Sequence, residues 1–146
     1  CWCRIRYQEG MGVESRMGVI CTCELRTCSG SMEQMNKVVV SPSCICSSMV
    51  ERIVEWCCEE LEFSGVTIHI SLRDSYKDCW GFCEQESKKV YRISICTDQS
   101  LRDFTATVCH EMIHVNQWIT GVWEGDGEEE CEEGQYEMAD AYWDSC

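Results

Sequence analysis

The sequence has little positive charge, a single proline and no long apolar run. Its 12 basic side chains stand against 26 acidic ones, which gives a net charge of −14. Such a chain repels the phosphate backbone that dominates nucleic-acid affinity, so we expect no direct nucleic-acid partner. No apolar stretch approaches the roughly 20 residues of a membrane span, and residues 1–7 lack the charged and apolar regions of a signal peptide. These absences predict a soluble protein without a membrane partner.

The sequence also lacks C-x-x-C pairs, although it contains 15 cysteines. Without such pairs no zinc-ribbon framework follows. The odd count prevents complete pairing within one chain, and several cysteines take positions where Ala, Val or Leu would suit a helix or strand interior. Free cysteine packs as a small hydrophobe, so we expect mostly reduced cysteines and favour an intracellular over a secreted protein. A framework with some disulfides is the alternative.

The length of 146 residues suits a single domain. We expect a β-rich lead-in over residues 1–42, with a strand at 37–41, and a core over residues 43–146. Ser48 and Glu51 have the S-x-x-E spacing of a capping box, and the helical periodicity that follows stops at Gly65.

Strand patterns follow this helix. Residues 66–70 are β-branched, and residues 88–96 alternate as a strand does, with a turn or short strand at 78–83 between them. These segments predict an α+β fold with a small, mostly antiparallel sheet. His69 lies in the first strand, where a lone histidine is more often a satisfied sheet residue than a ligand.

A second helix is predicted over residues 101–119, capped by Ser100 and ended by Gly121. It contains the pattern H-E-x-x-H as His110-Glu111-Met112-Ile113-His114. One apolar stripe forms on this helix from Leu101, Phe104, Val108, Met112, Val115 and Ile119. His110 and His114 fall outside the stripe, about 40° from one another, so both can face a cleft. H-E-x-x-H on a helix holds a zinc ion with its two histidines and supplies the glutamate as a general base.

A catalytic zinc site needs a third protein ligand, and no histidine follows His114. The segment 124–146 is rich in carboxylates and predicts a C-terminal helix. Helical phase places most of its acids on a solvated face, with only Glu128 and Glu132 toward the apolar side. A carboxylate facing a core must be paired or coordinated. We therefore favour Glu128 as the ligand. The alternatives are Glu132, Asp126, Glu133, Glu137 and Cys131.

The chain over residues 48–130 resembles the SprT-like zinc metallopeptidases and related minimal zincins. The resemblance rests on Cys79-Trp80-Gly81-Phe82-Cys83, on the strand at 91–95, and on Leu101-Arg102-Asp103-Phe104 leading into H-E-M-I-H. It implies a helix, a small sheet, an active-site helix and a following helix, with zinc held by both histidines and Glu111 as the base.

The resemblance departs from the family at the third ligand. SprT-like proteins usually supply a histidine from a Gly-His-Gly-like turn, and the corresponding turn here is Gly125-Asp126-Gly127. Either Asp126 replaces that histidine, or a glutamate on the next helix does so, as in gluzincin peptidases. The DNA-linked roles of some SprT-like proteins do not carry over to so acidic a chain.

The sequence thus predicts a zinc-dependent metalloendopeptidase that acts on a peptide or protein substrate. The strand at 91–96 is the expected open edge for a bound peptide. Trp118, Tyr91 and Trp123 could line subsites, although aromatic residues at such positions more often serve packing. No oxyanion donor is identifiable from the sequence, and Tyr76, Tyr91 and Arg92 are the candidates. The rival interpretations are a non-catalytic zinc module and a cysteine-rich structural or interaction protein.

Overall fold

A computed structural model describes residues 34–42, 44, 46–74 and 79–146. Seven elements occur in these ranges, in the order of the chain: β1 (Lys37–Ser41), α1 (Ser47–Glu60), β2 (Thr67–Arg73), β3 (Gly81–Ser87), β4 (Val90–Cys96), α2 (Leu101–Thr120) and α3 (Glu128–Ser145). The α+β class is therefore confirmed. The predicted strand at 37–41 is β1, whereas the rest of the predicted β-rich lead-in, over residues 1–33, lies outside the described residues.

The four strands form one sheet in the order β1-β2-β4-β3. β1 pairs with β2 and β2 with β4 in parallel, and only β3 and β4 are antiparallel. The prediction of a mostly antiparallel sheet was wrong. Helix α1 connects β1 to β2, and a helical crossover returns the chain to the same end of the sheet, which makes the two strands parallel.

The open edge of the sheet near helix α2 also differs from the prediction. The strand at 91–96 was expected to be open, but β4 lies between β2 and β3 and both of its sides are paired. The edge strand is β3, which begins at Gly81 and joins β4 through a tight hairpin. The segment taken for a turn or short strand at 78–83 thus contains the start of a seven-residue strand.

Helix α1 packs its apolar side on the sheet. Val50, Ile53 and Cys57 recur at helical spacing and are fully buried, so burial of this face stabilises the helix. The predicted capping box is wrong, because the helix begins at Ser47 and its N-cap, Cys46, makes no side-chain cap. The Ser47 hydroxyl instead accepts a hydrogen bond from the Cys44 backbone N–H at 2.8 Å.

Helix α2 has the predicted ends. The Ser100 hydroxyl accepts a hydrogen bond from the backbone N–H of Asp103, and Gly121 ends the helix in the left-handed conformation at φ +68°. The middle of the predicted apolar stripe is buried, while its two end residues, Leu101 and Ile119, are exposed.

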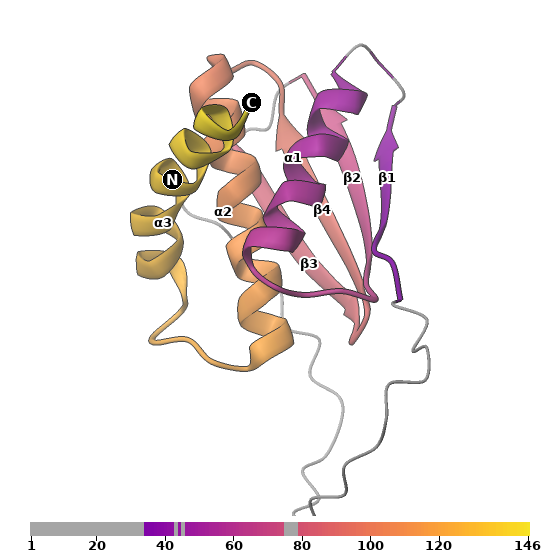
Figure 1. Cartoon of the computed structure of the whole chain (residues 1–146), viewed down its shortest axis with the longest axis vertical. Helices are drawn as coiled ribbons and strands as arrows, with labels where there is room; N and C mark the ends of the chain where they lie inside the picture. The colour runs from indigo at the N-terminus through magenta and orange to yellow at the C-terminus, as the bar shows by residue number, and fades with distance from the viewer. Residues whose placement is uncertain (1–33, 43, 45, 75–78) are drawn as a thin grey trace, which may run out of the picture.

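Figure 1 shows α1 and α2 side by side over the sheet, with α3 on the outside of α2. Helix α3 buries Cys131, Ala139 and Tyr142. The first residue of α3, Glu128, comes directly after a loop that returns the chain to the middle of α2. This return is what brings a second helix to the histidines.

Candidate metal centre

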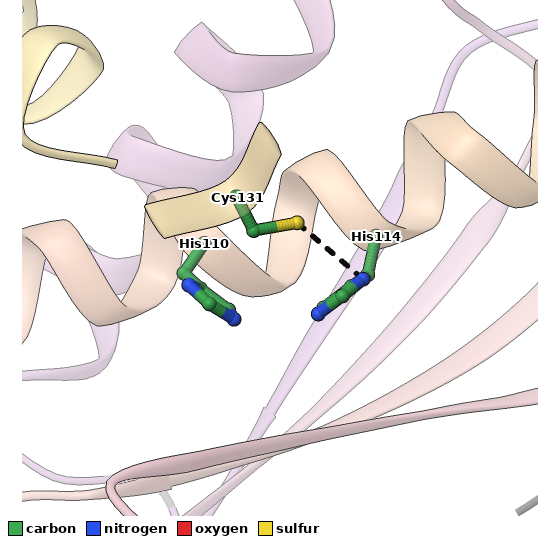
Figure 2. Close-up of side chains that lie close together, drawn as sticks. All are labelled: His110, His114 and Cys131. Atoms are coloured by element: carbon green, nitrogen blue, oxygen red, sulfur yellow. Dashed lines mark hydrogen bonds between the residues drawn. The ribbon is translucent and has the colours of Figure 1, made fainter. Parts of the chain in front are cut away.

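Helix α2 presents His110 and His114 one turn apart. The centroids of their rings are 5.0 Å apart and the ring planes meet at 74°. In Figure 2 both rings leave the same side of the helix and their outer ends point toward one another. His110 is partly exposed, whereas His114 is almost completely buried beneath α3. The two imidazoles can therefore bind one common ion from a single rigid helix.

The first side chain of α3 faces both rings. Glu128 Oε2 lies 3.3 Å from His110 Nε2, and Glu128 Oε1 lies 3.3 Å from His114 Nε2. Burial alone would raise the pKa of this carboxyl, but the two histidines outweigh it and hold the pKa at about 2. The structure thus places the favoured third ligand between the two Nε2 atoms, as an anion.

Cys131 lies one turn further along α3 and approaches the other side of His114. Its Sγ is 3.4 Å from His114 Nδ1, as the dashed line in Figure 2 shows. His110, His114 and Cys131 each offer a ligand atom, and these atoms lie within 4.8 Å of one another, so they form a group that could hold a metal ion. Burial raises the pKa of the Cys131 thiol, although the contact with His114 opposes that rise. The thiol form, which is the weaker ligand, is thereby favoured.

Glu111 is buried on the cleft side of α2, with 1% of its surface exposed. It packs against Gly81 so closely that a Cβ at that position would overlap Glu111 Oε1 and lie 2.8 Å from the Thr107 methyl. Glycine at the start of β3 therefore lets the edge strand approach the carboxylate. The C-x-G-x-C turn quoted for the family resemblance contains this glycine.

A cleft of about 770 Å³ opens beside Glu111 and His110. Its walls come from the start of β3, the loop before α2, the first half of α2, and α3. The acidic and aromatic side chains in this wall, apart from Glu111, are Trp80, Asp98, Asp103, Glu132 and Tyr136. His110 and the buried carboxylate of Glu111 thus border one open space with the size of a ligand site.

The other predicted acids do not point at the histidine pair in the same way. Asp126 is exposed, and its carboxylate accepts a hydrogen bond from the Glu128 backbone N–H at 3.2 Å, which suits the start of α3. Glu132 lines the cleft and is exposed. Glu133 and Glu137 are exposed as well. Of the carboxylates weighed from helical phase, only Glu128 lies within an ion-pair distance of both rings.

Most of the guessed subsite and oxyanion residues have structural roles. Tyr91 is fully buried, and Trp118 stacks between Tyr91 and His114 with ring centroids 6.0 and 6.4 Å away. Arg92 pairs with the exposed Glu86 at 2.8 Å. Because side chains alternate along β4, Arg92 projects from the sheet face opposite to the buried Tyr91. Trp123 is partly exposed, and Tyr76 lies outside the described residues.

Sequence reasoning overlooked Gln117, which is 4% exposed and contacts the buried side of the site. Its Oε1 lies 2.9 Å from His114 Nδ1, while its Nε2 donates to the Gly127 carbonyl at 2.9 Å and to Glu130 Oε2 at 2.8 Å. The available signal was a polar residue three positions after the second histidine, on the same face of the helix.

No family model, curated protein or solved structure matches this chain. None of the helices in the described part of the chain combines the length and apolar character that a membrane span requires. The chemistry of the site must therefore be argued from its own geometry.

Proposed function

We propose that this protein is a zinc-dependent peptidase in which His110, His114 and Glu128 hold the metal and Glu111 is the general base. The observation that carries the proposal is the position of the Glu128 carboxylate, 3.3 Å from the Nε2 atoms of both histidines. Two ligands bound about 2.0–2.1 Å from one tetrahedral zinc ion lie about 3.3 Å apart. Each histidine thus lies at about this spacing from one oxygen of the carboxylate, His110 from Oε2 and His114 from Oε1, which supports a shared ion.

The buried carboxylate of Glu128 also fits a cation. Among the described residues, Glu128 Oε1 is buried and accepts no hydrogen bond. A buried carboxylate oxygen costs several kcal/mol unless a proton or a cation compensates its charge. Its low pKa disfavours the proton. A divalent ion with two imidazoles and one carboxylate satisfies this oxygen, and such a donor set is that of a catalytic zinc site with one open position.

Cys131 is the competing third ligand. It requires the ion to sit on the Nδ1 side of His114, where the nitrogen also contacts Gln117 at 2.9 Å. Its thiol must lose a proton to bind, and burial raises its pKa. The charge and position of Glu128 therefore support the His-His-Glu set over the His-His-Cys set.

Bound zinc would acidify a water molecule and polarise the scissile carbonyl. Glu111 accepts the proton of the attacking water and then delivers it to the leaving nitrogen, which completes hydrolysis of the amide. Its burial beside Gly81 keeps the carboxylate in one position at the wall of the cleft. A peptide that pairs with the open edge of β3 would run past Glu111 and His110, with main-chain hydrogen bonds to hold it.

The charge of the cleft favours substrates with Lys or Arg side chains. Asp98, Asp103 and Glu132 line it, and none of its described lining residues is Lys or Arg. The nearby Arg102 is bound to Asp140 at 2.9 Å. Ser100 and Tyr136 both donate to the Asp103 carboxylate, at 2.6 and 3.1 Å, which holds it in place and lowers its pKa.

The ligand set is tested by metal analysis of two variants beside the wild type. Glu128→Ala should lose stoichiometric zinc, whereas Cys131→Ala should keep it. Cobalt in the zinc site adds a spectroscopic check, because a thiolate ligand gives an intense near-ultraviolet charge-transfer band that a carboxylate does not. Zinc retained in Glu128→Ala, or a thiolate band in the wild type, would show that the proposed ligand set is wrong.

The enzymatic step is tested with Glu111→Gln. This variant should retain zinc and lose peptide hydrolysis by about 10²–10⁴-fold, the usual contribution of a general base. The non-catalytic zinc module predicts stoichiometric zinc but no hydrolysis in the wild type. The cysteine-rich structural alternative predicts disulfides, so nearly 15 free thiols after denaturation would exclude it.

The preference for basic substrates is tested by comparing paired peptides that differ only by Lys against norleucine. Asp103→Asn should reduce the ratio of their kcat/KM values several-fold, whereas Glu137→Gln, on an exposed part of α3, should leave the ratio unchanged. An equal ratio in the two variants would reject an electrostatic role for Asp103.

A further inference from the structure

Gln117 has a fixed amide orientation. Its side-chain nitrogen lies against two acceptors, the Gly127 carbonyl and the Glu130 carboxylate, at 2.9 and 2.8 Å. Only an amide N–H₂ can donate to both, so the opposite amide atom, facing His114 Nδ1 at 2.9 Å, must be the oxygen. The acceptors belong to α3 and the loop before it, which means that α3 determines how Gln117 faces α2.

This orientation sets the tautomer of His114. An amide oxygen only accepts hydrogen bonds, so Nδ1 must carry the hydrogen. With the Nδ1 hydrogen fixed, Nε2 is the nitrogen that faces Glu128 Oε1 at 3.3 Å: it donates a hydrogen bond to the carboxylate while the ring is protonated, and it offers its lone pair to a metal once that hydrogen is lost. A hydrogen bond to the far nitrogen of a metal-binding histidine orients the ring and raises its basicity. It also occupies the nitrogen that Cys131 approaches at 3.4 Å.

The same side chain controls where α3 begins. Gly127 is left-handed at φ +82°, and a Cβ there would overlap Gln117 Oε1. The amide is therefore packed directly on the backbone of Gly127, and Glu128 is the next residue. One side chain thus contacts a histidine of α2 and the peptide unit that carries the carboxylate of α3.

We propose that Gln117 is the positioning residue of the metal centre: it selects the His114 tautomer that directs Nε2 toward Glu128 and it fixes the backbone from which Glu128 extends. This inference rests on the proposed function for its metal. The selection of the His114 tautomer is, by itself, a property of the metal-free protein.

The tautomer is tested in the metal-free protein by ¹H–¹⁵N correlation spectra of the histidine rings. Once its ring is neutral, wild-type His114 should show the Nδ1–H pattern, whereas the imidazolium that pairs with Glu128 carries a hydrogen on both nitrogens. Gln117→Met, which keeps the length of the side chain but neither accepts nor donates, should lose that preference. Asn116→Met, one position away on the same helix, is the matched control and should keep it. An Nε2–H pattern for His114 in the wild type would overturn the proposal.

Zinc affinity, measured by competition with a chromophoric chelator, is the second readout. Gln117→Met should raise the Kd for zinc by about 10–100-fold, the usual effect of losing such a partner, and Asn116→Met should not. Gln117→Glu separates the two halves: it still accepts from Nδ1–H but cannot donate to Gly127 or Glu130. It should therefore retain the tautomer and still weaken zinc binding. An unchanged Kd in both Gln117 variants would reject the positioning role.

These results are distinguishable from a failure of the peptidase proposal. If the wild type binds zinc but hydrolyses no peptide, the tautomer and the affinity changes still decide the role of Gln117. If the wild type binds no zinc, the proposed metal centre does not exist. The tautomer spectra then test only whether Gln117 sets the tautomer of His114.

Discussion

Helix α1 packs on the sheet through apolar side chains, whereas helix α2 meets the start of α3 through polar ones. Val50 and Ile53 are fully buried on the packed side of α1, and Cys57, also fully buried, lies 3.9 Å from Cys109 of α2. In the second, His114, Gln117 and Glu128 are in contact with each other or with neighbouring polar atoms. Hydrophobic burial is roughly proportional to area and tolerates exchange among apolar side chains, while each polar contact depends on one donor and one acceptor.

The α1–sheet interface stabilises the fold, whereas the α2–α3 junction contains the candidate metal centre. The α1–sheet interface should respond to volume and hardly at all to metal. The α2–α3 junction should respond to metal and to single polar atoms. Four experiments can break or sharpen this division.

Zinc itself should have the largest effect. At a free concentration about 1,000 times its Kd, zinc should raise the free energy of unfolding by about 4 kcal/mol. Hydrogen exchange should report where it binds: the amides at the start of α3 and in the second half of α2 should become more protected. Protection that increases only in α1 would contradict the division of the molecule into these two interfaces.

Ile53→Ala removes a fully buried side chain of the first interface. It should cost about 3 kcal/mol of unfolding free energy, in the middle of the range for such truncations. The zinc content per folded molecule should stay at the wild-type value. Urea denaturation and metal analysis measure the two quantities, and the exposed Glu55→Ala on the same helix is the control. A loss of zinc in Ile53→Ala would show that the interfaces are not independent.

Gly81→Ala tests the contact between the edge strand and the base. The new methyl group would overlap the Glu111 carboxylate and displace it. A displacement of about 1 Å costs on the order of 10²-fold in rate. Gly121→Ala is a matched glycine-to-alanine control, because nothing lies within 4 Å of the position that the new Cβ would take. It should cost about 1 kcal/mol of backbone strain without changing kcat/KM. Equal kcat/KM values for the two variants would remove Glu111 from the mechanism.

The smallest effect is expected at an exposed pair that joins α2 to α3. The Arg102 guanidinium donates two hydrogen bonds to Asp140 and lowers the pKa of that carboxyl. A depressed pKa contributes stability above the unfolded value of about 3.9, and that contribution disappears as the pH falls through the lower folded value. Asp140→Asn should therefore lower Tm slightly at pH 7 and not at pH 2. High salt should reduce the difference at pH 7. A Tm difference that persists at pH 2 would assign the effect to packing.

The apolar interface was largely predictable from the sequence. The periodicity of α1 and α2 gave both helices, and Ser100 and Gly121 gave the ends of α2, because each of these signals is local. The pairing of strands, in contrast, has no local sequence signal. It depends on the α1 crossover between β1 and β2, which alternation along a strand does not reveal. The predicted antiparallel sheet and the open edge at 91–96 were wrong for that reason.

At the site, spacing alone predicted that His110 and His114 share a face. Helical phase singled out Glu128, and its direction toward both rings supports that choice without testing whether it binds metal. The contact of Gln117 with Gly127 could not be predicted, because it depends on how the loop before α3 returns. Cys131 was weighed from its position in the helix, but its approach to Nδ1 rather than Nε2 is a matter of tertiary geometry.

The close fit of Gln117 on Gly127 implies a pattern that can be recognised in a sequence. A chain that builds this junction needs a glutamine three residues after H-E-x-x-H, and later a glycine directly before a glutamate. Glycine is required there by shape and the glutamine by its two-sided amide, so neither should vary while the junction persists. The pair can therefore serve as a query for distant relatives of this chain, and the retention of both residues together would be its signature.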